Sequence, residues 1–266
     1  MNYLVLNGGA NKDGNTWRLF EAAKALIRSE DASASFREIH LIDEGLPFCR
    51  GCSTCFRLGH EKCPHRAVAL KLIRAIEEAD GVVLLSPAYN MRETALLKNL
   101  FDHLSFMLHR PHFFTSRALI LTTAGGVGAK AAAKSIASFL KGIGFNRCQM
   151  FPVAAMSWND YRVSDKMRGR LKKTVRAFRR DVSSPRLKSP SALVMIPYNL
   201  FRGMAPHYAK GTAFETEDGV YWLDGERRRG VYDKSVPVPF YKKPVGHFFY
   251  LVGRIAGGRM AVTYRK

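Results

Sequence analysis

Short apolar runs with the character of β-strands alternate with stretches of helical period over the first 155 residues. Five such runs stand at Tyr3–Asn7, Phe36–Ile42, Gly81–Ser86, Arg117–Thr122 and about Gln149–Ala154. Between them, apolar side chains recur three or four positions apart, as the buried face of a helix requires. These faces comprise Trp17, Phe20, Ala23 and Ile27; Ala69, Leu72, Ile73 and Ile76; Leu97, Leu100, Phe101, Leu104 and Leu108; and Ala132, Ile136, Phe139 and Leu140. The pattern predicts an α/β fold in which strands and helices alternate.

Alternation of this kind, with short connections, is typical of a doubly wound parallel sheet covered by helices on both faces. Such a sheet binds ligands beyond the carboxyl ends of its strands, where the strand order reverses. With five strands in the order 2-1-3-4-5, that point lies between the first and third strands. The loops that follow these strands are therefore the first candidates for a binding site.

The loop after the first strand, residues 8–16, is rich in glycine and leads directly into a predicted helix. Gly8 and Gly9 allow backbone N–H groups to approach an anion closely. Asn15 or Thr16 is expected to cap the helix, whose dipole favours a phosphate group. The glycine spacing fits neither the dinucleotide motif G-x-G-x-x-G nor the triphosphate motif G-x-x-x-x-G-K-S/T. An ordinary tight turn is the alternative interpretation, but two further loops favour phosphate binding.

Two more loops at the same predicted edge suit a flat ligand. Ser86–Arg92 follows the third strand and combines a proline, an amide and the aromatic ring of Tyr89, which could stack on a planar group. Thr122–Gly128 follows the fourth strand, and its glycines allow the chain to pass close beside such a group. Either loop alone is compatible with a structural role. The three loops together predict a planar, phosphorylated cofactor.

Four of the five cysteines gather in one short loop, at Cys49, Cys52, Cys55 and Cys63. Two successive three-residue steps followed by a fourth thiol form the spacing used by 4Fe–4S clusters. Zinc sites usually combine two separated cysteine pairs, and no second pair exists here, although His60 or His65 could join such a site. Free thiols without metal and a thiol–disulfide pair are the remaining alternatives. The spacing predicts a shared role and leaves its nature open.

The net charge of +20 is concentrated in the second half of the chain. Residues 1–150 carry 19 Lys and Arg against 13 Asp and Glu, whereas residues 151–266 carry 23 against 9. A basic region attracts anions such as lipid headgroups, nucleic acid or a phosphorylated cofactor, unless it is simply a solvated face. Ser164 or Asp165 is expected to cap a basic helix that runs to about Val182 and packs on the sheet through a narrow apolar stripe.

A Ser-Ser-Pro break at residues 183–185 divides the chain into a predicted domain, residues 1–183, and an extension, residues 184–266. The extension has apolar patches at Ala192–Leu200 and Phe248–Ile255, both too short to span a bilayer. Each could pack on the main domain, cover a dimer partner or lie in a membrane interface. Nothing before the first strand has the character of a signal peptide, so we expect a cytoplasmic protein with reduced cysteines.

In combination, these motifs resemble a known family. The segments concerned are Leu6–Thr16, which ends in Lys-x-Gly-Asn-Thr, Pro47–Cys55 with Cys-x-Gly-Cys-x-x-Cys, Ala79–Tyr89 with Ser-Pro-x-Tyr, and Leu97–Asp102. Over about residues 1–155 they resemble the flavodoxin-like NAD(P)H-dependent FMN oxidoreductases, and the cysteine motif is most similar to that of the iron–sulfur flavoproteins. The resemblance implies a flavodoxin-like five-stranded sheet, FMN as cofactor, NAD(P)H as co-substrate and a homodimer.

The resemblance also assigns candidate residues by position. Lys12, Asn15 and Thr16 would contact the FMN phosphate, next to the backbone of Gly8 and Gly9. The remaining cofactor contacts would be Pro87, Ala88, Tyr89 and Asn90 along the ribityl chain and ring, and Thr123, Gly125 and Gly126 beside the isoalloxazine. An iron–sulfur cluster would be held by Cys49, Cys52, Cys55 and Cys63. The chain has Gly9 and Asn11 where the family usually has Ser and Arg.

We therefore expect an FMN-dependent oxidoreductase that transfers electrons from NAD(P)H through the flavin to an unidentified acceptor. The flavin carries the central chemistry, so no catalytic acid or base is assigned. An iron–sulfur flavoprotein that carries electrons without a nicotinamide is the first alternative. The second is a basic module without cofactor, associated with an anionic membrane surface or nucleic acid, of which nucleic acid is the less expected partner.

Overall fold

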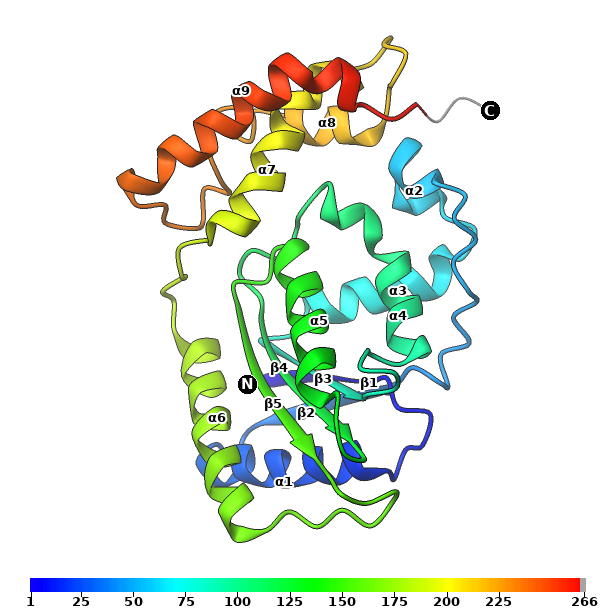
Figure 1. Ribbon diagram of the computed structural model, residues 1–266, viewed down its shortest axis with the longest axis vertical. Coiled ribbons are helices and arrows are strands. Elements are labelled where there is room, and N and C mark those ends of the chain that lie inside the picture. The colour runs from blue at the N-terminus through cyan, green and yellow to red at the C-terminus, as the bar shows by residue number, and fades with distance from the viewer. Residues whose placement is uncertain (264–266) are drawn as a thin grey trace.

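The computed structural model describes residues 1–263 and contains a five-stranded, all-parallel sheet in the order β2-β1-β3-β4-β5 (Figure 1). Its strands are β1 (Asn2–Asn7), β2 (Ser35–His40), β3 (Gly81–Pro87), β4 (Arg117–Ala124) and β5 (Arg147–Ala154). In the register, Leu6 of β1 lies opposite Ile39 of β2 and Leu84 of β3. The fold class and strand order predicted from the sequence are therefore confirmed.

Helices cover both faces of the sheet (Figure 1). On one face lie α1 (Asn15–Glu30) and α6 (Asp165–Ser183), which share a core cluster with Val5 and Val83. On the other face lie α3 (Arg66–Glu77), α4 (Ala95–His103) and α5 (Ala129–Gly142), which share a cluster with Leu84. The central strands are buried on both faces, which explains why they appear in the sequence as continuous apolar runs.

The helix after β3 is shorter than the sequence predicts. Its apolar face was expected to continue to Leu108, but α4 ends at His103, where the N–H of Leu104 is shared between the carbonyl oxygens of Leu100 and Phe101 and the hydrogen-bond spacing changes from four residues to three. The chain then tightens into a 3-10 helix, η2 (Ser105–Leu108), and the Leu108 side chain is exposed. The second strand likewise ends two residues early, since a turn begins directly after it.

The basic helix α6 has the packing expected of the last helix over the sheet. The Ser164 hydroxyl caps it by accepting a hydrogen bond from the N–H of Met167. Leu171, Val175 and Phe178 form its buried stripe. Arg176 and Arg179 both pair with Glu30 at the end of α1. Part of the basic side of α6 is thus committed to holding two helices together.

Residues beyond α6 form a helical layer at one end of the molecule (Figure 1). It contains α7 (Ala192–Met204), α8 (Glu217–Leu223) and α9 (Lys243–Met260), with the 3-10 helices η3 (Ala205–Tyr208) and η4 (Phe240–Lys242). A third core cluster around Tyr198 and Trp222 joins α7 and α8 and includes Phe114 from the loop before β4, while α9 packs directly on α7. No helix within residues 1–263 is both long and apolar enough to cross a membrane. The domain boundary at residue 183 stays a prediction, and residues 264–266 of the extension lie outside the described residues.

Candidate functional site

A cleft of about 210 Å³ opens beyond the carboxyl ends of β1, β3, β4 and β5. It lies at the predicted point of reversal, where β1 and β3 are neighbours and their connections run to opposite faces of the sheet. Its lining residues are Gly9, Asn11, Gly14, Asn15, Thr16, Pro87, Ala88, Tyr89, Thr123, Ala124, Gly125, Ser157, Trp158 and Asn159. Four loops from distant parts of the chain therefore meet at one site.

The N-terminus of α1 forms one wall of this cleft. Gly14 occupies the capping position, and no side chain accepts a hydrogen bond from the first turn. The sequence-based expectation that Asn15 or Thr16 caps the helix is wrong, because both residues already lie within its first turn. The first N–H groups of a helix have no partner within the helix, and they carry the positive end of its dipole. An uncapped helix end that faces a cleft is a site for an anion.

Asn15 instead holds the loop that follows β5. Its amide nitrogen donates hydrogen bonds to the carbonyl oxygens of Ser157, at 2.8 Å, and Trp158, at 3.2 Å. Its amide oxygen accepts a hydrogen bond from the N–H of Tyr161, at 3.0 Å. The side chain is thus committed to the protein itself, and it fixes Trp158, whose side chain is 96% exposed at the rim of the cleft.

Two buried threonines join the loops on either side of the cleft. The hydroxyl oxygens of Thr16, in the first turn of α1, and Thr123, at the end of β4, lie 2.5 Å apart. Both side chains are almost completely buried. Since one hydroxyl donates and the other accepts, this contact fixes the distance between the start of α1 and the glycine-rich loop after β4.

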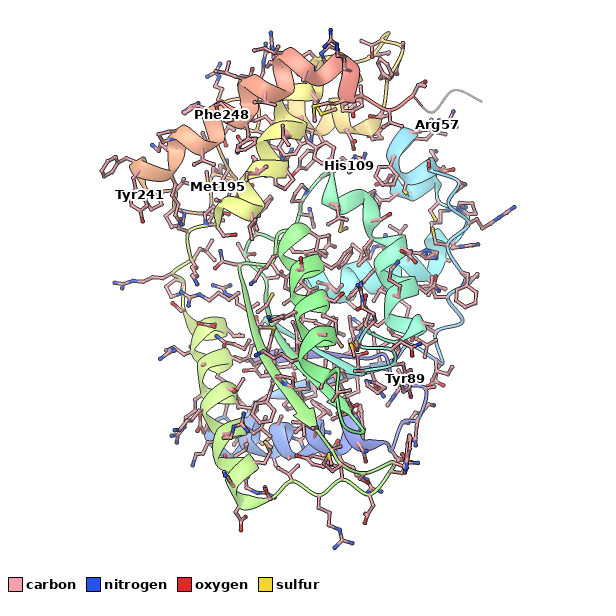
Figure 2. All side chains as sticks on the ribbon, in the orientation of Figure 1. Arg57, Tyr89, His109, Met195, Tyr241 and Phe248 are labelled. Atoms are coloured by element: carbon pink, nitrogen blue, oxygen red, sulfur yellow. The ribbon has the colours of Figure 1, made fainter. Side chains whose placement is uncertain are left out.

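The loop after β3 is a two-residue hairpin. The backbones of Tyr89 and Arg92 exchange both hydrogen bonds, and Asn90 and Met91 between them have φ of 49° and 62°. Positive φ at both central residues is the requirement of a type I′ turn, in which asparagine is a favoured first residue. The hairpin presents Tyr89, 60% exposed, beside the cleft, where Figure 2 labels its side chain.

Most of the predicted cofactor residues line the cleft, and four do not. Gly8 lies beneath it, where a Cβ would stand 2.9 Å from the Cβ of Leu97. The Lys12 ammonium pairs with Asp43 at the surface, at 2.5 Å. Asn90 occupies the hairpin turn, and Gly126 is not among the lining residues. Their assignment as FMN contacts stays a prediction, as does that of the lining residues.

Sequence reasoning missed the loop after β5, which contributes Ser157, Trp158 and Asn159. A signal was available, because β5 was expected to be parallel to β1 and its carboxyl end therefore had to lie at the same edge. Asn11, Gly14 and Ala124 were also missed as lining residues, although each stands next to a predicted one.

The four clustered cysteines lie in the segment that contains α2 (Thr54–Arg57) and η1 (His60–Lys62). Cys49 and Cys52 are exposed, and Cys55 and Cys63 are half-buried. Within residues 1–263, no three His, Cys, Asp or Glu side chains converge closely enough to hold a metal ion. The thiols nevertheless interact electrostatically. Burial raises the pKa of Cys55 to about 11, and the charges of Cys63 and Cys49 add to this effect.

A buried ion pair connects this cysteine loop to the C-terminal extension. The guanidinium of Arg110 donates hydrogen bonds to the carbonyl oxygen of Cys55, at 2.6 Å, and to a carboxylate oxygen of Asp218, at 2.9 Å. The second carboxylate oxygen of Asp218 lies 2.8 Å from the Nδ1 of His109. Arg110 and Asp218 are 7% and 2% exposed, so α8 reaches into the main domain and holds the loop through Arg110.

Two further side chains of α8 complete this contact. The Nε1 of Trp222 donates a hydrogen bond to the carbonyl oxygen of His109, and the Tyr221 hydroxyl donates one to the carbonyl oxygen of Pro111. Figure 2 labels His109 at the junction between η2 and the helical layer. Asp218, Tyr221 and Trp222 of the extension thus bind the segment 109–111, which in turn holds the backbone of the cysteine loop through Arg110.

With the geometry established, comparison with known proteins decides the family. The model of one family, described as NADPH-dependent FMN reductase, matches residues 1–159, more than half of the chain. The chain belongs to this family. The match covers all five strands, the cleft and the cysteine loop, and it ends before α6.

Curated relatives of this NADPH-dependent FMN reductase family member match parts of the same region. An iron–sulfur flavoprotein of Archaeoglobus fulgidus is 33% identical over 104 residues, which are 39% of this chain and 46% of the relative. An iron–sulfur flavoprotein of Methanocaldococcus jannaschii is 34% identical over 102 residues, 38% of this chain and 51% of the relative. The chain therefore spans about half the length of these relatives.

Solved structures support the fold. A flavoenzyme NAD(P)H:(acceptor) oxidoreductase of Paracoccus denitrificans superposes with a TM-score of 0.50 at 22% identity, covering 68% of this chain and 96% of its own. An NADH:FMN oxidoreductase gives the same TM-score and identity and covers 69% of this chain and 90% of its own. At this identity the likeness is one of fold, and it fits the flavodoxin-like sheet described above.

Proposed function

We propose that the cleft binds FMN and that the protein transfers electrons from NAD(P)H through this flavin to an acceptor that is still to be identified. The observation that carries the proposal is the uncapped N-terminus of α1, which faces a cleft at the point of reversal in the sheet. Family membership supports the same cofactor. The cofactor-free basic module considered from the sequence has no comparable support.

The residues around the cleft fit the parts of FMN. The first N–H groups of α1 suit the phosphate, because they combine unpaired donors with the positive end of a dipole. A Cβ at Gly125 or Gly126 would meet no atom within 4 Å, so the loop after β4 leaves space for a flat ring. Tyr89 and Trp158 offer exposed aromatic rings at the rim.

The division of labour follows from this fit. When bound, FMN supplies the redox chemistry, since a flavin accepts a hydride from a nicotinamide and passes electrons on singly or in pairs. The helix N-terminus of the chain neutralises the phosphate, and the Thr16–Thr123 contact keeps the two glycine-rich loops at a fixed spacing. The hairpin at Tyr89 and the loop held by Asn15 both line the cleft.

The direct test is anaerobic reduction after reconstitution. Purified protein is saturated with FMN, freed of excess cofactor by gel filtration, and mixed with NADH or NADPH while the flavin absorbance is recorded. We expect the flavin band to be retained through the column and then bleached by at least one nicotinamide. Loss of all FMN on the column would contradict the proposal, and so would retained flavin that neither nucleotide reduces.

An iron–sulfur cluster on the cysteine loop is the second candidate function. Two observations favour it, namely the gathering of Cys49, Cys52, Cys55 and Cys63 in one short loop and the description of the relatives as iron–sulfur flavoproteins. The test is iron and sulfide content after anaerobic purification. Cys52→Ser should abolish bound iron, whereas Cys148→Ser, on β5 outside the loop, should leave it unchanged. Wild-type protein without iron would exclude the cluster.

The oligomeric state and the cellular location are also proposals. A homodimer is proposed from the family resemblance, and sedimentation velocity of the wild-type protein tests it. A single species at the mass of one chain, 29.9 kDa, would contradict it. A cytoplasmic location is proposed with it, and fractionation of cells tests that assignment.

A further inference from the structure

The two faces of α9 have different partners. Its inner face packs closely on α7 through glycines, since a Cβ at Gly203 would stand 2.2 Å from the carbonyl oxygen of Tyr250, and one at Gly253 would stand 2.4 Å from that of Leu200. Gly246 and Gly257 on the same side are also buried. Small residues at this seam allow the two helices to approach at backbone distance. The inner face of α9 is thus buried in this helix–helix contact.

The outer face of α9 carries large apolar side chains that contact little of the protein. Phe248, Leu251 and Ile255 are 59%, 54% and 85% exposed. Their spacing of three and four residues places them on one stripe along the helix. Phe240 and Tyr241, just before the helix, are also exposed. Figure 2 shows Phe248 on α9 and Tyr241 at the end where this helix begins.

The charged residues of the segment that carries this stripe have a single sign. Residues 240–263 contain no Asp or Glu, while Lys243, Arg254 and Arg259 on α9 are exposed. Lys242 is used internally, because its ammonium donates hydrogen bonds to the Ser189 hydroxyl and to the carbonyl oxygen of Pro190. An exposed apolar stripe whose own segment carries only cations is complementary to a surface that is apolar below and anionic above.

This charge pattern distinguishes a lipid surface from a second copy of the chain. A two-fold interface built on the stripe would bring the same cations from both copies together without any acid of the segment between them. A helix of 18 residues with an inner face committed to α7 is also unsuited to leave its partner and span a bilayer. A helix that lies in the membrane interface neither has to leave α7 nor has to span the bilayer.

We propose that the outer face of α9, formed by Phe248, Leu251 and Ile255 with the flanking cations, docks this protein onto anionic lipid bilayers. The apolar stripe enters the headgroup region, and Lys243, Arg254 and Arg259 stay at the level of the lipid phosphates. Figures 1 and 2 place α9 at one end of the long axis and Tyr89, beside the cleft, towards the other. Docking through α9 therefore leaves the cleft accessible from the aqueous side.

Vesicle cosedimentation tests this inference on the full chain. One set of vesicles contains phosphatidylcholine alone, and the other contains equal parts of phosphatidylcholine and phosphatidylserine. We expect about tenfold stronger binding to the anionic vesicles, reduced by added salt. The triple variant Phe248→Ser, Leu251→Ser and Ile255→Ser should lose about tenfold of that binding. Val220→Ser, on α8 and also exposed, is the matched control and should bind as the wild type.

A second pair of variants separates docking from general basicity. Arg254→Gln with Arg259→Gln removes two exposed cations from α9, and Lys172→Gln with Lys173→Gln removes two from α6. The proposal predicts a larger loss for the α9 pair. Equal losses for the two pairs would overturn it, as would unchanged binding of the triple serine variant. A dimer that the triple variant abolishes, without any vesicle binding by the wild type, would overturn it in favour of self-association. Circular dichroism checks that each variant is folded.

Discussion

The cleft and the cysteine loop belong to the same family-matched region, but the chain positions them in different ways. The cleft is formed where regular elements end, so the sheet itself brings its four loops together. The cysteine loop contains only the short helical elements α2 and η1 and is held from outside. Arg110, which follows η2, contacts its backbone, and Asp218 of the extension pairs with Arg110. One site is organised by the fold and the other by a buried ion pair.

This difference predicts where the extension matters. Removing contacts of α8 should disturb the cysteine loop and leave the cleft intact, because no residue beyond Asn159 lines the cleft. Conversely, a charge placed at the N-terminus of α1 should change cofactor binding without affecting the extension. The effect of a variant in one region should therefore not depend on a variant in the other, because the two regions lie more than one structural layer apart.

The largest effect is expected at the buried ion pair. Asp218→Asn leaves the guanidinium of Arg110 buried without its countercharge, which should cost about 3 kcal/mol of stability. Thermal unfolding measures the loss. Asp224→Asn, which breaks an exposed pair with Arg227, is the control and should cost less than about 0.5 kcal/mol.

The same variant tests the role of the extension in positioning the thiols. If Asp218 acts on the loop through Arg110, Asp218→Asn should also increase the rate at which Cys55 reacts with a thiol reagent at a temperature where the protein is folded. An equal rate in Asp218→Asn and wild type would show that the loop keeps its conformation without the ion pair and that Asp218 does not position it.

The second effect concerns the packing of the extension itself. Gly253→Ala places a methyl group against the carbonyl oxygen of Leu200 and should destabilise the protein by about 2 kcal/mol, because α7 and α9 must separate. Gly169→Ala makes the same chemical change on α6, where no atom lies within 4 Å, and should stabilise by about 0.5–1 kcal/mol. Denaturant midpoints of the two variants should move in opposite directions, and a shift in the same direction would contradict the packing.

The smallest of the three effects concerns the cleft. Gly14 has an ordinary extended backbone, and a Cβ there meets only Asn11 at 3.5 Å, so larger residues fit. Gly14→Asp would cap α1 but place a negative charge at the proposed phosphate site, and should weaken FMN binding about tenfold. Gly14→Asn has the same size without the charge and should bind FMN nearly as the wild type does. Fluorescence titration compares their affinities for FMN, and equal affinities would contradict binding of the phosphate at this position.

The residues show why some of this could be predicted and some could not. The sheet order and the loops after β1, β3 and β4 follow from local patterns, since a buried strand, a glycine-rich turn and a helix stand next to each other in sequence. The ion pair of Lys12 with Asp43 and the use of Asn15 to hold Ser157 are choices among distant partners. The role of Asp218 is a further case, because its partner Arg110 lies 108 residues away along the chain.

The central claim is that the N-terminus of α1 binds the phosphate of a flavin in the cleft. Titration calorimetry of the wild-type protein with FMN and with riboflavin, which lacks only the phosphate, tests it most directly. The account predicts one FMN per chain and an affinity for FMN at least about tenfold above that for riboflavin, since a helix N-terminus and its N–H groups favour the dianion. Equal affinity for the two ligands, or no heat with either, would contradict it.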